Sequence, residues 1–262
     1  MLPTRATSIR TDFRERMRAT MNDSVETVDA EQAGAERLGG GRDALRPGQR
    51  VLSLVEFAIG SAAVVAHNAF HVGPNEVYVL VVGGLASLRL RNGGWGRLGM
   101  GWPSSWWRTL GAAFLAAVVR LLLSGLVVEP LTASFWPSPA ASAYGFEEIT
   151  GHIGVALRWL LTAWTFAALG EEISYRGYLL ARAADVGGRS RAAYWIGLVA
   201  VSVLFGVGHF YKGPAGMIDS GVGGFVFGAA YLLSGRNLWV SILAHGFVDT
   251  VGVLALYFGL AS

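Results

Sequence analysis

Three clusters of ionisable residues lie inside apolar stretches of this chain. The clusters are Glu171-Glu172-xxx-Arg176, Phe205-xxx-His209 and His245-xxx-Asp249. An ionisable side chain at the centre of a membrane-spanning helix costs about 2.5–3.5 kcal/mol on insertion scales. Because that cost needs a compensating role, we take these clusters as the candidate functional residues.

The first cluster holds two adjacent acids and a base. Glu172 and Arg176 are four residues apart, so on a helix they share a face and can pair. Glu171 projects about 100° away and stays available for a partner elsewhere in the bundle. The alternative interpretation is a buried ion pair that only fixes helix packing.

The other two clusters place histidines at helical spacing. His209 shares a face with Phe205, and a lone histidine in an apolar helix is often a hydrogen-bonded structural residue. His245 and Asp249 also share a face. They are either a structural His–Asp pair or half of a metal or hydrogen-bonding site.

The elements that must position these clusters are apolar and long. The chain of 262 residues is 53% hydrophobic and 15% charged, with a mean hydropathy of +0.44, whereas a soluble domain carries about 25% charged residues. A membrane-spanning helix needs roughly 20 mainly apolar residues, and the alternating pattern of a membrane β-barrel is absent from the sequence. We therefore predict an all-α polytopic transmembrane helical bundle of about seven spans, six to eight in all, at 51–70, 76–90, 106–128, 155–183, 192–211, 217–234 and 238–260.

The basic residues support this division. Connections rich in arginine alternate with connections that lack it, as the preference for positive charge on the cytoplasmic side requires. The pattern predicts an integral membrane protein with its N-terminus in the cytoplasm and its C-terminus outside. The composition is rich in arginine and poor in lysine, which favours a bacterial inner (cytoplasmic) membrane. No basic and aromatic stripe suggests nucleic-acid binding, so the expected partner is the lipid bilayer.

The charges also divide the chain. Residues 1–50 hold 17 of the 39 Asp, Glu, Lys and Arg residues, and they predict a disordered cytoplasmic tail without a cleavable signal peptide. Residues 51–150 are expected to form the first three helices and an outer loop at 129–150, and residues 151–262 a catalytic core. The chain has no cysteine, which excludes disulfides, thiolate zinc sites and a cysteine nucleophile.

The three clusters are expected at similar depths. Glu171 lies about 21 Å and His209 about 27 Å from the loop at 185–191, at 1.5 Å per helical residue. His245 and Asp249 lie about 12–18 Å from the same side. Convergence of the clusters on one buried site is therefore consistent with the spacing.

In this order and setting, the clusters resemble the CAAX-processing and bacteriocin-processing (CPBP, or Abi) family of intramembrane proteases, which includes the type II CAAX prenyl endopeptidases. The family pattern is EExxxR, then FxxxH, then HxxxN or HxxxD, and the resemblance covers about 155–255. It implies a peptidase, a CPBP family intramembrane metalloprotease or glutamate protease, that cleaves a membrane-associated peptide or protein.

The resemblance also implies roles. Glu171 would be the general base that activates a water, and His209 would hold or polarise that water. His245 and Asp249 would line the site and stabilise the oxyanion, or complete a metal shell. Glu172 and Arg176 would support them. Asp249 stands where the prenyl endopeptidases have Asn, and an anionic carboxylate is a poor oxyanion donor.

The cofactor and the function class stay open at this point. Either a divalent metal, with zinc the best match, or no metal at all agrees with this residue set. The metal ligands would be Glu171, His209, His245 and Asp249. The alternatives to a protease are a non-catalytic membrane scaffold or immunity protein of the same fold, and an ion-coupled transporter.

Overall fold

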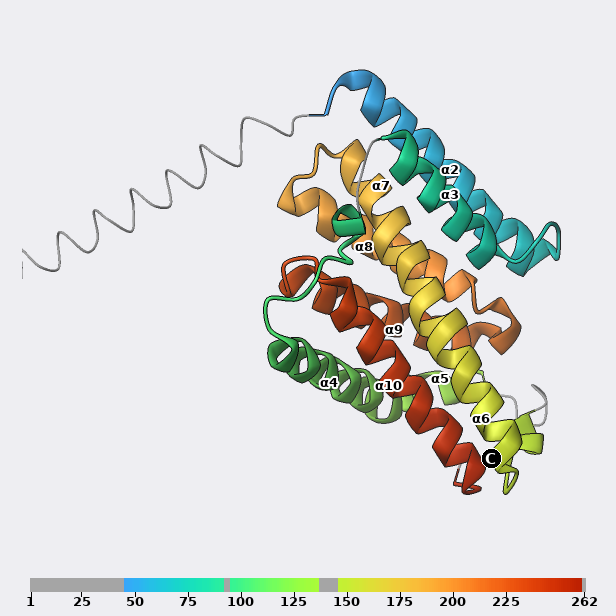
Figure 1. Ribbon diagram of the computed structural model, residues 1–262. Coiled ribbons are helices and arrows are strands. Elements are labelled where there is room, and N and C mark those ends of the chain that lie inside the picture. The colour runs from blue at the N-terminus through green and yellow to red at the C-terminus, as the bar shows by residue number, and fades with distance from the viewer. Residues whose placement is uncertain (1–44, 92–94, 137–145, 261–262) are drawn as a thin grey trace, which may run out of the picture. The chain divides into compact units, whose positions relative to one another are not determined.

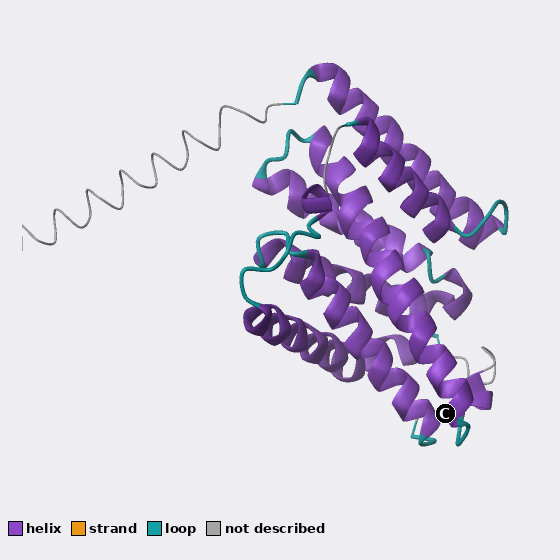
Figure 2. Cartoon of the chain, in the orientation of Figure 1, coloured by secondary structure: helices purple, strands orange, loops and turns teal. Residues whose placement is uncertain are grey.

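The apolar segments of the sequence form helices. The computed structural model describes residues 45–91, 95–136 and 146–260, and this part of the chain is helical without strands (Figures 1 and 2). This confirms the predicted all-α class. The main helices are α2 (Pro47–Phe70), α3 (Glu76–Leu90), α4 (Trp106–Leu123), α5 (Glu129–Ala133), α6 (Ile153–Thr162), α7 (Leu180–Val186), α8 (Arg191–Val207), α9 (Gly213–Leu233) and α10 (Leu238–Tyr257).

Among the described residues, five helical stretches are long and apolar enough to cross a membrane. They are Pro47–Phe70, Trp106–Ala133, Ile153–Val186, Phe210–Leu233 and Leu238–Tyr257. Two of the seven predicted spans are shorter helices, because α3 has 15 residues and α8 has 17. Many large apolar side chains on these helices face outward; Leu90 and Trp107, for example, are more than 80% exposed. A surface of this kind is suited to lipid, and the chain is an integral membrane protein.

The helix boundaries follow local chemistry, with one correction to the prediction. Side-chain oxygens of Asn75, Ser190 and Asn237 accept hydrogen bonds from the first free N–H groups of α3, α8 and α10, as helix N-caps do. The predicted outer loop at 129–150 begins later than expected. A π-helical turn, Ser124–Val128, carries α4 into α5, so the chain stays helical to Ala133.

Proline does not prevent this continuation. Pro130 comes just after the π-helical turn, and prolines in long helices commonly lie where the regular hydrogen-bond ladder is interrupted. Residues 137–145 of the predicted loop lie outside the described residues. The same is true of residues 1–44 of the tail predicted at 1–50.

Close packing of α8 against α9 depends on small residues. A Cβ atom added to Gly228 would lie 2.1 Å from Leu198, and one added to Gly206 would lie 2.6 Å from the backbone oxygen of Met217. At Gly224 the added atom would meet the ring of Phe205 at 3.1 Å. Glycines allow membrane helices to approach in this way, and here they let α9 pack closely on α8, the helix that leads to His209.

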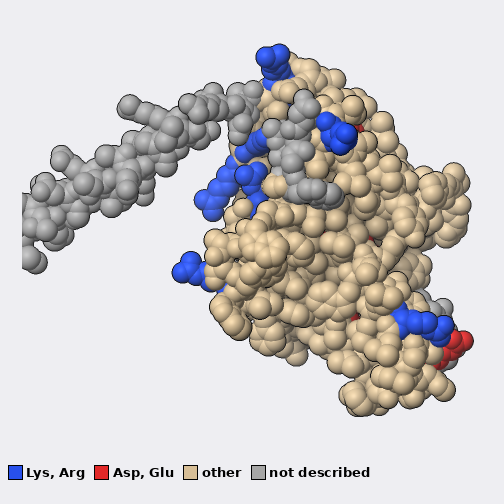
Figure 3. All heavy atoms as spheres, viewed as in Figure 1, with Lys and Arg blue, Asp and Glu red and all other residues tan. Residues whose placement is uncertain are grey.

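One end of the bundle gathers the basic residues. Arg91, the residue after α3, contacts Glu56 on α2 at 2.6 Å, and Arg182 on α7 contacts Asp185 at 3.2 Å. Asp185 is fully buried and also accepts a hydrogen bond from Ser53 of α2. Figure 3 shows Lys and Arg side chains gathered where α2 begins and α7 ends. These ion pairs tie α2, α3 and α7 together.

Residues Pro47–Ser262 form one compact unit. Within it the stretch from α6 to α7 is a single long helix (Figure 1), which packs on α3 and α10 and is continuous from Ile153 to Val186. The first motif lies in the middle of this helix, where α3, α8 and α10 all contact it.

Candidate active site

The first motif lies on a π-helical segment of the long helix. The turns Ala163–Glu171 and Ile173–Leu179 have π-helical hydrogen bonding, with Glu172 between them, where the sequence predicted an ordinary α-helix. Such turns are rare and occur frequently at functional sites. The wider turn keeps Glu172 and Arg176 on one face, with Arg176 Nη1 at 2.8 Å from Glu172 Oε1.

Arg176 is completely enclosed. Its side chain and that of Glu172 have no exposed surface. Its second guanidinium nitrogen, Nη2, donates to the backbone oxygen of Gly224 on α9 at 2.7 Å. The ring of Phe205 on α8 lies 4.6 Å from the guanidinium carbon. The side chain of Arg176 therefore contacts α8 and α9 as well as its own helix.

The third motif binds the same carboxylate. His245 Nδ1 lies 2.9 Å from Glu172 Oε1, so this ring nitrogen donates to the carboxylate. The imidazole stacks on the ring of Phe227 at 4.9 Å between centroids. Its other nitrogen, Nε2, is 3.6 Å from Asp249 Oδ2, which is beyond ordinary hydrogen-bond length. Asp249 is thus beside His245 without being fixed to it.

The second motif lies partly outside its predicted helix. The prediction extended that helix to residue 211, but α8 ends at Val207, where Gly208 follows, and His209 lies in the turn beyond it. The ring still contacts Phe205, at 4.8 Å between centroids. His209 Nδ1 donates to the backbone oxygen of Phe205 at 2.8 Å. This bond sets the tautomer and leaves Nε2 for another partner.

Glu171 differs from its neighbour. Its Oε2 is buried and has no hydrogen-bond partner, although the residue as a whole is half-buried. It is within electrostatic range of His245, Asp249 and Lys212. Oε1 of Glu172 is held by Arg176 and His245, while its Oε2, like that of Glu171, is buried without a hydrogen bond. Separate roles for the two acids stay a prediction.

Phe205 ties the three motifs together. Its ring contacts His209 and Arg176, and His245 lies 6.0 Å away between centroids. Residues 153–251 match the family model for type II CAAX prenyl endopeptidase Rce1-like proteins. The matched segment contains all three motifs, which confirms the predicted resemblance. No curated protein and no solved structure matches the chain significantly.

The matched segment contains side chains of the kind that bind zinc, but they are not grouped as a metal site. Each histidine uses Nδ1 for a carbonyl or carboxylate oxygen and leaves Nε2, which is how metal-bound histidines are oriented. Yet no three His, Asp or Glu side chains of the described residues are grouped closely enough to hold an ion. The residues as placed do not fit a metal, so the mechanism below has no step through one.

Two residues near the motifs escaped the sequence analysis. Tyr175, only 1% exposed, packs its ring on Phe205 at 5.0 Å, and its hydroxyl lies against Gly208. Lys212 is within electrostatic range of Glu171 and Asp249, whereas the sequence placed it in a connecting loop. The sequence did contain one feature that singles out Lys212, because it is the only lysine in the chain.

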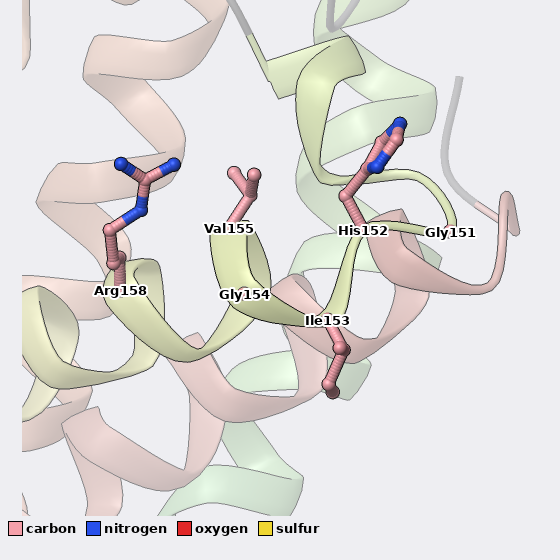
Figure 4. A pocket seen from close by; sticks show the side chains of 6 residues that line it. All are labelled: Gly151, His152, Ile153, Gly154, Val155 and Arg158. Atoms are coloured by element: carbon pink, nitrogen blue, oxygen red, sulfur yellow. The ribbon is translucent and has the colours of Figure 1, made fainter.

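A surface hollow lies elsewhere. It is lined by residues 151–155 and Arg158, at the start of α6 (Figure 4). In Figure 4 the side chains of Val155, His152 and Arg158 stand on one side of this turn. None of the motif residues lines it, so the hollow does not belong to the candidate site.

Proposed function

We propose that this chain is an intramembrane endopeptidase that hydrolyses a peptide bond in a membrane-associated peptide or protein. The observation that carries the proposal is the contrast between two adjacent acids. Oε1 of Glu172 accepts hydrogen bonds from Arg176 and His245, whereas none of the described residues donates a hydrogen bond to Glu171, although its Oε2 is buried beside the same cluster. The Rce1-like match supports a CAAX protease-like peptidase at the level of the family.

In the proposed reaction, Glu171 is the general base and His209 holds the attacking water through Nε2. The water oxygen forms a bond to the carbonyl carbon as its proton moves to Glu171, and the carbonyl oxygen becomes an oxyanion. The carbon–nitrogen bond then breaks, and the proton passes from Glu171 to the leaving amine. A general base of this kind contributes about 100- to 10,000-fold to the rate.

The engaged residues position the reacting ones. Arg176 and His245 hold Glu172 and thereby fix the rotation of the helix that carries Glu171. Asp249 lies beside His245 Nε2, which suits it to orient that imidazole. As a carboxylate it is a poor donor to an oxyanion.

Neither rival has comparable support. A scaffold would place no requirement on Glu171, whereas the proposed reaction needs it as the general base. An ion-coupled transporter would use the same acids as a relay. That rival predicts substrate movement in sealed vesicles without cleavage.

The test uses purified protein in detergent and a quenched-fluorescence peptide library that includes lipidated members. Glu171→Gln is compared with Glu148→Gln, and His209→Ala with His152→Ala, because Glu148 and His152 are exposed residues. We expect both site variants to lose cleavage and both controls to retain it.

Two results would contradict the proposal. One is cleavage by Glu171→Gln at the wild-type rate. The other is a folded wild-type protein that cleaves no member of a broad library above the level of Glu171→Gln, in which case the scaffold interpretation takes its place. Uptake of a substrate into vesicles that depends on Glu171 would favour the transporter.

A further inference from the structure

The only lysine of the chain lies next to the proposed catalytic residues. Twenty of the 21 basic residues are arginines, and the remaining one is Lys212. A 3₁₀ turn, Phe210–Lys212, links His209 to α9. The backbone N–H of Lys212 donates to the oxygen of His209 at 2.9 Å. The position of the lysine is therefore fixed relative to His209.

The stem of the Lys212 side chain lies along the first turn of α9. A Cβ atom added to Gly216 would lie 2.2 Å from Lys212 Cβ and 3.3 Å from its Cγ and Cδ, so the lysine stem occupies the space above this glycine. The ammonium nitrogen lies 5.7 Å from the ring centroid of Tyr211, and that ring stacks on His209. The ammonium group is also within electrostatic range of Glu171 and Asp249.

The proposed reaction needs a cation that the motifs do not supply. Glu172 and Asp249 are both within electrostatic range of Glu171, and the tetrahedral intermediate adds a further negative charge. Arg176 is committed to Glu172 and to the backbone of Gly224. Asp249 cannot donate to the intermediate while it is ionised.

Arg120, a second arginine that contacts α9, also has an ion-pair partner. Arg120 of α4 donates to Asp219 at 2.5 Å, and the Oγ of Ser124 donates to the same carboxylate at 2.7 Å. Arg120 lies across Gly223, where an added Cβ atom would come within 2.4 Å of its Nε. This arginine is thus held in place beside α9, whereas a lysine ammonium is a compact group on a flexible stem.

We propose that Lys212 is a further catalytic residue of the peptidase, and that its ammonium group binds the oxygen of the scissile carbonyl. The inference rests on the proposed function. As water adds to the carbonyl carbon, the electron pair of the carbon–oxygen double bond moves to the oxygen. Lys212 donates a hydrogen bond to that oxyanion and keeps its proton throughout. When the carbon–nitrogen bond breaks, the double bond re-forms and the ammonium group is released unchanged.

The composition of the chain allows a selective test. Because the chain has no cysteine, Lys212→Cys introduces a single thiol. Alkylation with 2-bromoethylamine then rebuilds an ammonium group at this position alone, and alkylation with iodoacetamide supplies a neutral group as the matched control. Lys212→Met removes the charge while keeping an unbranched stem. Arg158→Met, at an exposed cation on α6, controls for loss of a positive charge.

We expect Lys212→Met to lower kcat about 100-fold with little change in KM, as removal of an oxyanion donor does. The unfolding midpoint should stay near that of the wild type. Aminoethylation of Lys212→Cys should restore kcat, whereas carbamidomethylation should not. Wild-type protein treated with 2-bromoethylamine shows whether alkylation at other positions matters.

A second measurement tests the placement without cleavage. Reductive methylation with ¹³C-formaldehyde labels the single lysine side chain, and its NMR signal reports the surroundings of the amine. The signal should shift in Glu171→Gln and stay in place in Glu148→Gln. An unshifted signal in Glu171→Gln, or an unchanged kcat in Lys212→Met while Glu171→Gln is inactive, overturns the assignment and leaves the proposed function standing. A folded wild-type protein that shows no cleavage overturns both the assignment of Lys212 and the proposed function.

Discussion

His245 Nδ1 donates a hydrogen bond to Oε1 of Glu172 at 2.9 Å, although 73 positions separate the two residues in the chain. The same oxygen accepts a hydrogen bond from Arg176. One carboxylate oxygen thus joins the first motif to the third, and it does so where neither Glu172 nor Arg176 has contact with solvent. This junction determines what several substitutions should do.

Removing the arginine should destabilise the protein strongly. Arg176→Met leaves Glu172 without its ion-pair partner in an enclosed site, and breaking a buried pair in this way costs about 3–5 kcal/mol. Unfolding by denaturant in detergent measures the change, with Arg158→Met as the exposed control. Exposed ion pairs contribute about 0–1 kcal/mol. A loss of unfolding free energy below about 1 kcal/mol would therefore contradict the structural role assigned to this buried pair.

The stability of the protein should respond differently to the same substitution at the two adjacent glutamates. Glu172→Gln should lower the unfolding midpoint, because it removes the negative charge paired with the buried guanidinium of Arg176. Glu171→Gln should leave the midpoint unchanged or raise it, since it removes a charge whose Oε2 has no hydrogen bond. Cleavage should be lost in Glu171→Gln despite the retained stability. Equal destabilisation by both substitutions would argue against separate roles.

The contact between α8 and α9 should be sensitive at Gly206. An alanine there places its Cβ 2.6 Å from a backbone oxygen of α9, and backbone cannot rotate away as a flexible side chain does. Overpacking of this kind costs about 1–3 kcal/mol, and the displaced helix end should misplace His209. Gly252→Ala on α10 is the matched control, because nothing lies within 4 Å of its added Cβ. Similar stability and cleavage in the two variants would contradict this account of the packing.

Chelation should have little effect on cleavage. The described residues bring no three His, Asp or Glu side chains together as a metal site, so we expect 1,10-phenanthroline to leave the initial rate within twofold of the untreated protein. The control is the non-chelating 1,7-phenanthroline. Loss of cleavage with the first compound alone, reversed by added zinc, would show that the side chains regroup around a metal and would replace the metal-free mechanism.

The sequence by itself determined the helical class, the apolar segments and the identity of the motif residues. These follow from local properties, because apolar length specifies a membrane helix and a four-residue spacing places Glu172 and Arg176 on one face. The sequence also separated Glu171 from its neighbour. It placed His209 within a helix, however, whereas the chain turns after Gly208.

Only the tertiary structure decided which partners these residues have. The period of a helix shows which residues share its face, but it carries no information on how one helix is rotated or translated against another. Those degrees of freedom are set by contacts between helices, such as the glycines that bring α9 onto α8 and the ring of Phe205 between Arg176 and His209. That is why the bond between His245 and Glu172, and the place of Lys212 beside the acids, emerge from packing rather than from the order of residues.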